Sequence, residues 1–210
     1  MKDEERIRCP VHDLISFKRS RADDALLWEL IQSRPIQRLR RIKQLGFSEF
    51  VYPGATHSRF SHSLGAMQMA RRMIDVLSRN QSFDTSGDHD KTATLVAALL
   101  HDIGHGPYSH VFEDILDHFG IKRNHEAFTL ALIEGTEIKD KLTAAGLYEK
   151  TINLFTKEPG YNVFNAIISS QLDCDRLDFL CRDRYHTGIR SAALDLEWLF
   201  DSLRIEEVPI

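Results

Sequence analysis

Cysteine is scarce in this chain, and long hydrophobic runs are absent. Only three cysteines occur among 210 residues, Cys9, Cys174 and Cys181. An odd number without paired spacing is typical of free thiols in a reducing compartment, so we expect a cytoplasmic protein without disulfides. No apolar run approaches the ~18 residues that span a membrane. The charged start of the chain also lacks the apolar segment of a signal peptide, so we expect no membrane partner.

A large excess of positive charge is missing too. The formal net charge is −4 at pH 7, with 27 Lys and Arg against 31 Asp and Glu. This balance argues against a protein whose whole surface binds nucleic acid. The basic run at 38–43 is the best support for a nucleic-acid-binding alternative, but such a run is more often a solvated helix face.

Helical spacing of apolar residues dominates the sequence and predicts a mainly α fold. We expect a short N-terminal β-hairpin at about 6–18, with Pro10 at an edge or turn, and a helical core at about 22–205. The length suits one domain, and we find neither repeats nor a low-complexity linker, so 1–210 is treated as a single domain.

The segment after the first helix has clear start and stop signals. Pro35 suits the first turn of a helix, and Gly46 suits the position just after a helix ends. Between them, Arg38 and the other basic residues are expected to point largely outward. Residues 47–53 are then expected to form a short extended piece.

Further along, polar and turn-forming residues at 80–91 indicate a surface loop that includes His89. Pro107 is expected to begin a helix that runs to Gly120. Asn124 is a good N-cap for the helix that follows it.

The most informative stretch is 97–110, Ala-Ala-Leu-Leu-His-Asp-Ile-Gly-His-Gly-Pro-Tyr-Ser-His. An apolar helix runs into His101-Asp102, is broken by glycines and a proline, and is followed by His105 and His110. Imidazole and carboxylate ligands suit metals such as Mn, Fe, Ni, Zn or Co. Packing explains the apolar residues but not the polar cluster, so we favour a metal site over simple capping of a helix end.

Two other segments can complete such a site. His62 lies on the first turns of a helix, and Arg59 precedes it by three residues, so both can share one face. A late segment is rich in aspartate, namely Asp173, Asp175, Asp178 and Asp183. The chain therefore presents a histidine, then the His-Asp pair, then a late aspartate.

This order resembles that of the HD-domain metal-dependent phosphohydrolase superfamily, and most closely its deoxynucleoside triphosphate triphosphohydrolase (dNTPase) branch. The similarity covers about 7–190 and includes the segments 37–46, 51–65, 101–110 and 173–183. Each segment alone is a weak signal, but their joint order is highly specific. The resemblance implies an HD-domain helical bundle.

The resemblance also implies four metal ligands: His62, His101, Asp102 and Asp175. Two imidazoles and two carboxylates leave about two positions of an octahedron for water and phosphate oxygen. The cofactor is then a divalent transition metal ion, Mn, Fe, Ni, Co or Zn, with Mg as a further candidate. Asp102 alternatively orients a metal-bound histidine from outside the ligand set.

Residues that bind a nucleotide follow from the same resemblance. Arg59 and Arg176 would hold phosphates, because a planar guanidinium matches phosphate oxygens. Gln44 and Asp183 would bind the sugar 3′-hydroxyl, and Leu45 would pack near C2′ and reject a ribose hydroxyl.

Four residues are implied in catalysis. His110 would donate a proton to the leaving triphosphate oxygen or position the nucleophile, with His105 and His125 nearby. Histidine suits this role because its ordinary pKa is near neutrality. Glu126 would orient His125 or His110.

The chain departs from the family pattern at several positions. Arg176 replaces a phosphate-binding lysine, and Phe179, also expected at the substrate, replaces a tyrosine. Glu113 replaces an aspartate. Relatives usually continue through a further C-terminal helical region. We expect structural or surface roles for the remaining candidates, Asp173, Asp178, His12, His57, His118 and His186.

The resemblance implies hydrolysis of a dNTP to deoxynucleoside and triphosphate, by attack of metal-bound water on the α-phosphate, in a homo-oligomeric enzyme. One alternative is an HD-type nucleotidase or phosphodiesterase that acts on another nucleotide. Another is a non-catalytic regulator that binds nucleotides or nucleic acid. Released triphosphate or monophosphate would separate the two enzymes, and a steep salt dependence of DNA binding would support the regulator.

Overall fold

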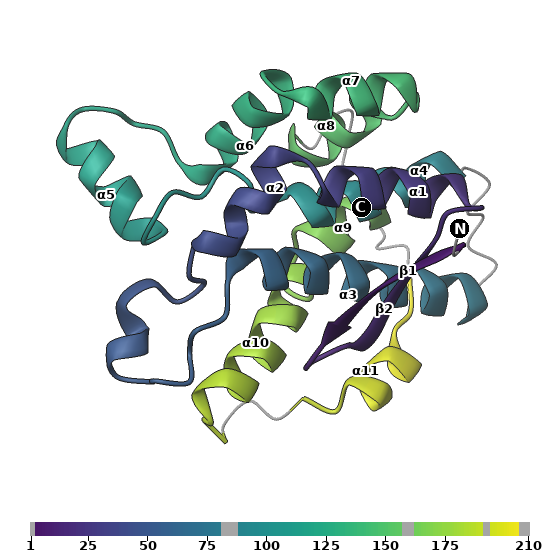
Figure 1. The fold of residues 1–210 in the computed structure, drawn as a ribbon. Coiled ribbons are helices and arrows are strands. Elements are labelled where there is room, and N and C mark those ends of the chain that lie inside the picture. Colours follow the sequence, from purple (N-terminus) through teal and green to yellow (C-terminus); the bar gives the residue numbers. More distant parts are fainter. Residues whose placement is uncertain (1–2, 81–87, 157–161, 191–193, 206–210) are drawn as a thin grey trace, which may run out of the picture.

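A computed structural model describes residues 3–80, 88–156, 162–190 and 194–205 of the chain (Figure 1). Helices make up most of these residues, which confirms the mainly α class. The predicted hairpin is also present: β1 (Glu4–Cys9) pairs antiparallel with β2 (Asp13–Lys18), in a register that sets Ile7 opposite Ile15. Ile15 and Phe17 on β2 are fully buried and attach the hairpin to the helices.

The helices divide into a central group and a covering group. The central group comprises α1 (Ala22–Ile31), α3 (Arg59–Asn80), α4 (Asp88–Leu100) and α10 (Cys174–Thr187). The covering group comprises α2 (Arg34–Arg38), α5 (His110–His118), α6 (His125–Glu134), α7 (Glu137–Ala144), α8 (Tyr148–Thr156), α9 (Val163–Ile168) and α11 (Leu196–Ser202). In the described part of the chain, no helix is both long enough and apolar enough to cross a membrane.

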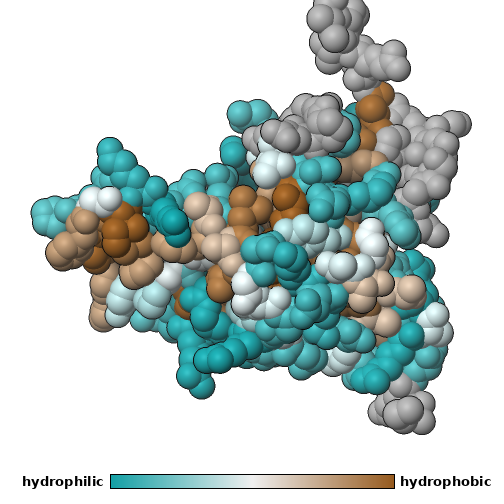
Figure 2. Space-filling view, turned by 90° about the horizontal axis from the view of Figure 1, so that it is seen from above, coloured by the Kyte–Doolittle hydropathy of each residue, from teal (hydrophilic) through white to brown (hydrophobic). Residues whose placement is uncertain are grey.

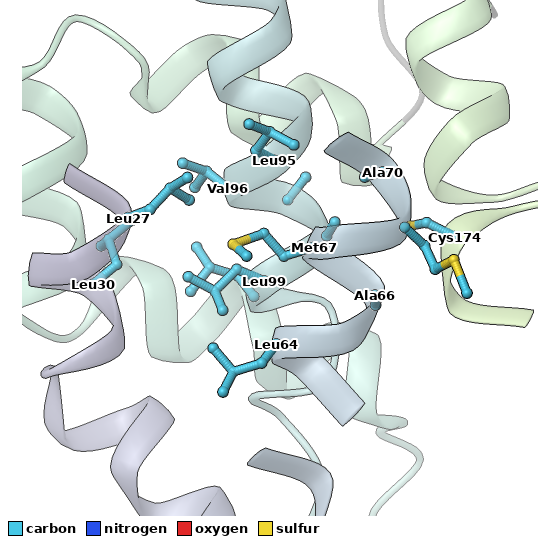
Figure 3. Close-up of a cluster of buried hydrophobic side chains, with 14 of the residues drawn as sticks. Leu27, Leu30, Leu64, Ala66, Met67, Ala70, Leu95, Val96, Leu99 and Cys174 are labelled. Carbon is cyan, nitrogen blue, oxygen red and sulfur yellow. The ribbon is translucent and has the colours of Figure 1, made fainter. Parts of the chain in front are cut away.

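The hydrophobic core lies where α1, α3 and α4 meet. Met67 of α3 lies between the leucines of α1 and the apolar face of α4, and Leu99 lies beside it (Figure 3). Both side chains are fully buried. Burying one side chain of this size stabilises the fold by about 1.5–3 kcal/mol. This packing fixes the start of α3 and the end of α4, where the residues of the polar cluster lie.

Helices α3 and α10 approach each other closely at Gly65. A Cβ atom built there would lie 1.9 Å from Asp178 Oδ1 and 2.3 Å from Arg182 Nη2. Both of these α10 side chains are fully buried. Only a residue without a side chain therefore allows the ion pair to lie against α3.

Predictions for three regions are wrong. The first region contains the helix expected to end at Gly46 and the piece that follows it. Helix α2 ends at Arg38, a 3-10 turn (Leu39–Arg41) follows, and Ile42 is extended. The reason is pairing with the segment before α3, since Arg59 N donates to Ile42 O and Gln44 N donates to His57 O. The expected extended piece at 47–53 instead begins with a 3-10 helix (Gly46–Phe50).

The second error concerns Pro107, which does not start a helix. Tyr108 and Ser109 have positive φ values of 63° and 56°, so α5 cannot begin before His110. The third concerns His89, which lies in α4 rather than in a loop. The rest of that expected loop, 81–87, lies outside the described residues.

The predicted N-cap at Asn124 is confirmed, and two further helix ends are defined by caps. Asn124 caps α6 by accepting a hydrogen bond from Ala127 N, and Asp173 caps α10 by accepting one from Arg176 N. Gly188 ends α10 in the left-handed conformation with φ 76°.

Helix α5 projects from the body of the molecule (Figure 1). Apolar side chains gather on its surface, at the left of Figure 2, and include Val111, Ile115 and Phe119, with exposed fractions of 43%, 48% and 74%. The loop before α5 is attached through Tyr108, whose ring stacks on Phe47 with centroids 4.3 Å apart.

Replacing Gly65 by alanine should destabilise the protein strongly. The new Cβ would displace the Asp178–Arg182 pair, and overpacking together with disruption of a buried ion pair costs about 3 kcal/mol or more. Denaturant unfolding of the metal-free protein measures the loss. Gly135→Ala is the control, because its Cβ would meet only Ala131 O, at 3.1 Å. Equal stability of the two variants would contradict the close approach.

Candidate metal centre

Three helices bring together side chains that could hold a metal ion. His62 comes from the first turns of α3, His101 follows the end of α4, and Asp175 lies on the first turn of α10. His62 Nε2 is 2.9 Å from Asp175 Oδ1 and 3.3 Å from His101 Nε2. One ligand atom from each residue lies within 4.8 Å of the others. The structure thus unites three of the four predicted ligands around one point.

The orientation of the two imidazoles suits a metal ion. Their rings are nearly perpendicular, with an interplanar angle of 82°, so the two Nε2 lone pairs can converge. The opposite nitrogens are held by acceptors: His62 Nδ1 donates to Asp178 Oδ2 at 2.7 Å, and His101 Nδ1 donates to Ala98 O at 2.8 Å. A hydrogen bond from Nδ1 leaves Nε2 as the ligand atom.

Asp102, the fourth predicted ligand, lies at the edge of this group. Its Oδ1 is 3.3 Å from His101 Nε2, and its Oδ2 is 3.7 Å from His62 Nε2. Arg59 forms a buried ion pair with the same carboxylate. Both predicted roles of Asp102, direct ligation and orientation of a ligand, are compatible with these distances.

The protonation of the group shows why a cation fits it. Burial alone would lower the pKa of His62, but hydrogen bonds to Asp175 and Asp178 outweigh it and raise the pKa to about 10. Burial opposes ionisation of Asp175 as well, yet hydrogen bonds from His101 and His62 hold its pKa below the usual range. Without a metal, protons on the histidines offset the carboxylate charge. A divalent ion can take over that role, with neutral imidazoles as ligands.

The loop that follows His101-Asp102 is held from two sides. Arg38 donates hydrogen bonds to the carbonyl oxygens of Ile103 and His105, so it does not point outward as predicted. On the other side, Thr129 Oγ1 donates to His101 O and accepts from Gly104 N, both at 3.0 Å. These contacts fix the backbone of the loop directly after the end of α4.

A second group contains His105, Glu113 and His125, and its ligand atoms also lie within 4.8 Å. Here the His105 and His125 rings are stacked, with centroids 4.0 Å apart and planes only 12° from parallel. Because lone pairs lie in the ring planes, these two cannot converge on one ion without rotation of a ring. His125 Nδ1 instead donates to Glu113 Oε1 at 2.9 Å. In this arrangement the group is held by ring stacking and a hydrogen bond and is not set up for chelation.

Glu113 occupies the position that we expected for Glu126. It contacts His125 and lies 3.5 Å from His110 Nδ1 through its second oxygen. Glu126 is exposed and accepts a hydrogen bond from Asn124. His105 is buried, and this burial lowers its pKa to about 4. Its imidazole is therefore neutral at pH 7. Unlike buried His105, His110 has a side chain that is 71% exposed.

The predicted substrate residues differ in exposure. Arg59 is buried, and besides Asp102 it contacts Ser109 Oγ through Nε and Nη2, at 2.9 and 2.7 Å. Arg176 is exposed and adjacent to Asp175, while Phe179 and Leu45 are partly buried. Asp183 accepts a hydrogen bond from His57 Nε2 at 2.8 Å. Gln44 Oε1 is buried and has no hydrogen-bond partner among the described residues.

Sequence reasoning missed several residues that support the site. Asp178 holds His62, His57 holds Asp183, and Glu113 holds His125. The departure of Glu113 from the family pattern was the only signal for any of them. The others pair with residues that are more than 100 positions away in sequence.

Comparison with known proteins agrees with this geometry. The HD domain family matches residues 59–178, and the chain belongs to this family. It is 39% identical to the uncharacterized protein YwfO of Bacillus subtilis over 99% of this chain and 46% of that protein. It is 31% identical to the deoxynucleoside triphosphate triphosphohydrolase SAMHD1 of Homo sapiens over 88% of this chain and 34% of that enzyme.

Among solved structures, a phosphohydrolase from Bacteroides thetaiotaomicron is similar with a TM-score of 0.83 and 35% identity. The match covers 97% of this chain and 48% of that one. The chain thus spans about a third to a half of the length of these relatives. The predicted membership of the HD-domain family is confirmed.

Metal binding should release protons. His62 is protonated below its pKa of about 10, and the Nε2 proton must leave before that nitrogen can bind a metal. At pH 7, uptake of Mn²⁺ should release about one proton, and the apparent affinity should increase with pH by up to ~10-fold per unit. Calorimetry in two buffers of different ionisation enthalpy measures the release. A binding enthalpy that is independent of the buffer would contradict this protonation state.

Proposed function

We propose that this chain is a metal-dependent phosphohydrolase that hydrolyses dNTPs to deoxynucleoside and triphosphate. The convergence of His62, His101 and Asp175 carries the proposal. These residues, with Asp102, would hold a divalent Mn, Fe, Ni, Co, Zn or Mg ion. Such an ion polarises a phosphoryl group and lowers the pKa of water. The proposal includes a cytoplasmic homo-oligomer in which residues 1–210 form one HD domain.

Arg59 is suited to bind a phosphate beside the metal centre. Its guanidinium has five N–H donors, and the contacts to Asp102 and Ser109 engage Nε and one N–H of each terminal nitrogen. One donor on each terminal nitrogen remains for a phosphate oxygen. Because Asp102 and Ser109 already fix the side chain, little conformational entropy is lost when phosphate binds. Arg176, exposed and next to Asp175, would contribute a second guanidinium.

His110 is the best candidate for the proton donor to the leaving triphosphate. It is more exposed than either histidine of the second group and lies beside the Glu113 carboxylate. His125 is held by Glu113 through Nδ1, which leaves its Nε2 free to act near the substrate. His105 stays neutral and supports His125 by stacking.

The deoxyribose would lie near the segment before α3. Gln44 Oε1 is a buried acceptor that a 3′-hydroxyl could satisfy. Asp183 is oriented by His57 through Oδ1, so its Oδ2 is an alternative acceptor for the single proton of this hydroxyl. Leu45 lies between Gln44 and Gly46 and would leave no room for a ribose 2′-hydroxyl.

Hydrolysis should depend on Asp175. We would incubate the protein with each dNTP, GTP and a deoxynucleoside monophosphate, with Mn, Fe, Mg, Ni, Co or Zn in turn, and identify the products by ion-pair chromatography. Intact triphosphate and deoxynucleoside are expected, and Asp175→Asn should lower kcat by about 100-fold or more. Asp140→Asn, an exposed aspartate on α7, is the matched control. Phosphate from the monophosphate alone would favour a nucleotidase, and no turnover despite a bound ion would favour a binding protein.

Sugar discrimination should depend on Leu45. Shortening this side chain in Leu45→Ala should raise kcat/KM for GTP relative to dGTP by about 10-fold, since removal of a few methylene groups from a pocket changes selectivity by that order. Leu116→Ala on α5 serves as the control. An unchanged ratio in a folded, active Leu45→Ala variant would remove Leu45 from the sugar site.

A further inference from the structure

A buried chain of hydrogen bonds connects the N-terminal hairpin to the metal centre. His12, in the turn between β1 and β2, has a side chain that is only 2% exposed. Its Nε2 lies 2.5 Å from Asp178 Oδ1. The other oxygen of Asp178 accepts from His62 Nδ1 at 2.7 Å. His12 therefore reaches a metal-ligating histidine through one shared carboxylate.

The hydrogen bonds to Asp178 show that His12 does more than balance the charge of this carboxylate. Arg182 already binds the carboxylate with two hydrogen bonds, Nε to Oδ2 and Nη2 to Oδ1, both 2.8 Å long. This pair neutralises the charge and engages one lone pair on each oxygen. His12 and His62 occupy the remaining lone pairs, one on each oxygen. The carboxylate is thus fixed in position by three side chains, and its direction toward His62 depends on all of them.

The turn that presents His12 is itself constrained. Asp13, the next residue, has a φ of 58°, a conformation uncommon for residues other than glycine. The hairpin is anchored independently of His12, through the fully buried Ile15 and Phe17 and through Cys9, whose Sγ lies 3.5 Å from Arg182 Nη2. A strained turn that directs a buried histidine at a shared carboxylate indicates a role beyond packing.

We propose that His12 is a positioning residue of the metal centre, which acts through Asp178 to fix the orientation and tautomer of His62. The Nδ1–H of His62 is directed to Asp178, so that Nε2 is presented to the ion between His101 and Asp175. This inference rests on the metal-binding role proposed above. It also makes the N-terminal hairpin a part of the site, although the hairpin contributes no ligand.

The test compares two replacements of His12 by their effect on binding of Mn²⁺ alone. His12→Leu removes the donor, whereas His12→Gln can place an amide N–H where the imidazole Nε2–H lies. Loss of a residue that orients a ligand typically weakens metal binding by about 10–100-fold, so we expect that loss in His12→Leu and a substantial recovery in His12→Gln. His118→Leu, an exposed histidine on α5, should bind Mn²⁺ like the native protein. Equilibrium dialysis gives the affinities.

Two further readouts separate positioning from stability. Nitrogen-15 NMR of the protein loaded with diamagnetic Zn²⁺ should show a neutral His62 with a protonated Nδ1 in the native protein and a changed Nδ1 signal in His12→Leu. The unfolding temperature without metal reports stability alone. A lower unfolding temperature with unchanged Mn²⁺ affinity in His12→Leu would overturn the proposal, and so would equal loss of affinity in the Leu and Gln variants.

This experiment also distinguishes the inference from the proposed function. If the native protein binds Mn²⁺ in an Asp175-dependent manner but hydrolyses no dNTP, the substrate assignment fails while the role of His12 is still measured by affinity. If the native protein hydrolyses dNTPs and His12→Leu binds Mn²⁺ normally, the role of His12 fails alone.

Discussion

Asp178 is a carboxylate with no exposed surface, and its charge has to be satisfied entirely by neighbouring groups. Arg182, one helical turn further along α10, supplies the charge, and the two histidines complete the hydrogen bonds. Removing one partner of a buried ion pair costs about 3–5 kcal/mol, so these positions are tightly coupled. The pair also dictates the sequence of α3, because only a glycine at position 65 leaves room for it. The same ion pair thus sets both the packing of α3 against α10 and the position of His62.

The site combines rigid elements with one irregular loop. His62 and Asp175 lie on the first turns of long helices, while the segment after α4 carries the remaining polar residues. Arg38 and Thr129 hold that segment through its carbonyl oxygens and Gly104 N. The loop therefore keeps its backbone polar groups paired although it leaves the helix. This arrangement allows an imidazole-rich surface to form without disturbing the apolar core around Met67.

Local signals in the sequence were sufficient for most of the fold. Amphipathic spacing and the cap at Asn124 predicted helices correctly, because these features depend on residues a few positions apart. The failures occurred where distant segments decide the backbone. Gly46 looked like the end of a helix, but pairing with the segment before α3 ends regular helix at Arg38. Pro107 suited a helix start, but the strained Tyr108 and Ser109 delay it.

The same limit applies to the candidate site. The broken helix at His101-Asp102 is a local pattern, and with the family order it predicted residues that the structure brings together. The sequence predicts only a structural or surface role for Asp178. No neighbouring residue indicates that His12, which is 166 positions away, contacts one oxygen of its carboxylate. Glu113 and Glu126 both lie near the first turn of a helix, and only the placement of α5 relative to the start of α6 decides which one meets His125.

A buried acceptor without a donor is a final physical argument for a ligand with hydroxyl groups. Gln44 Oε1 is buried and has no hydrogen-bond partner in the described part of the chain, and such a group costs about 1–3 kcal/mol when it stays unsatisfied. The backbone of Gln44 is fixed by His57 O, and His57 also orients Asp183, so the amide and the carboxylate are supported by one residue. A sugar hydroxyl that donates to either group would repair this deficit. In the function proposed above, the 3′-hydroxyl of the nucleotide would supply this donor.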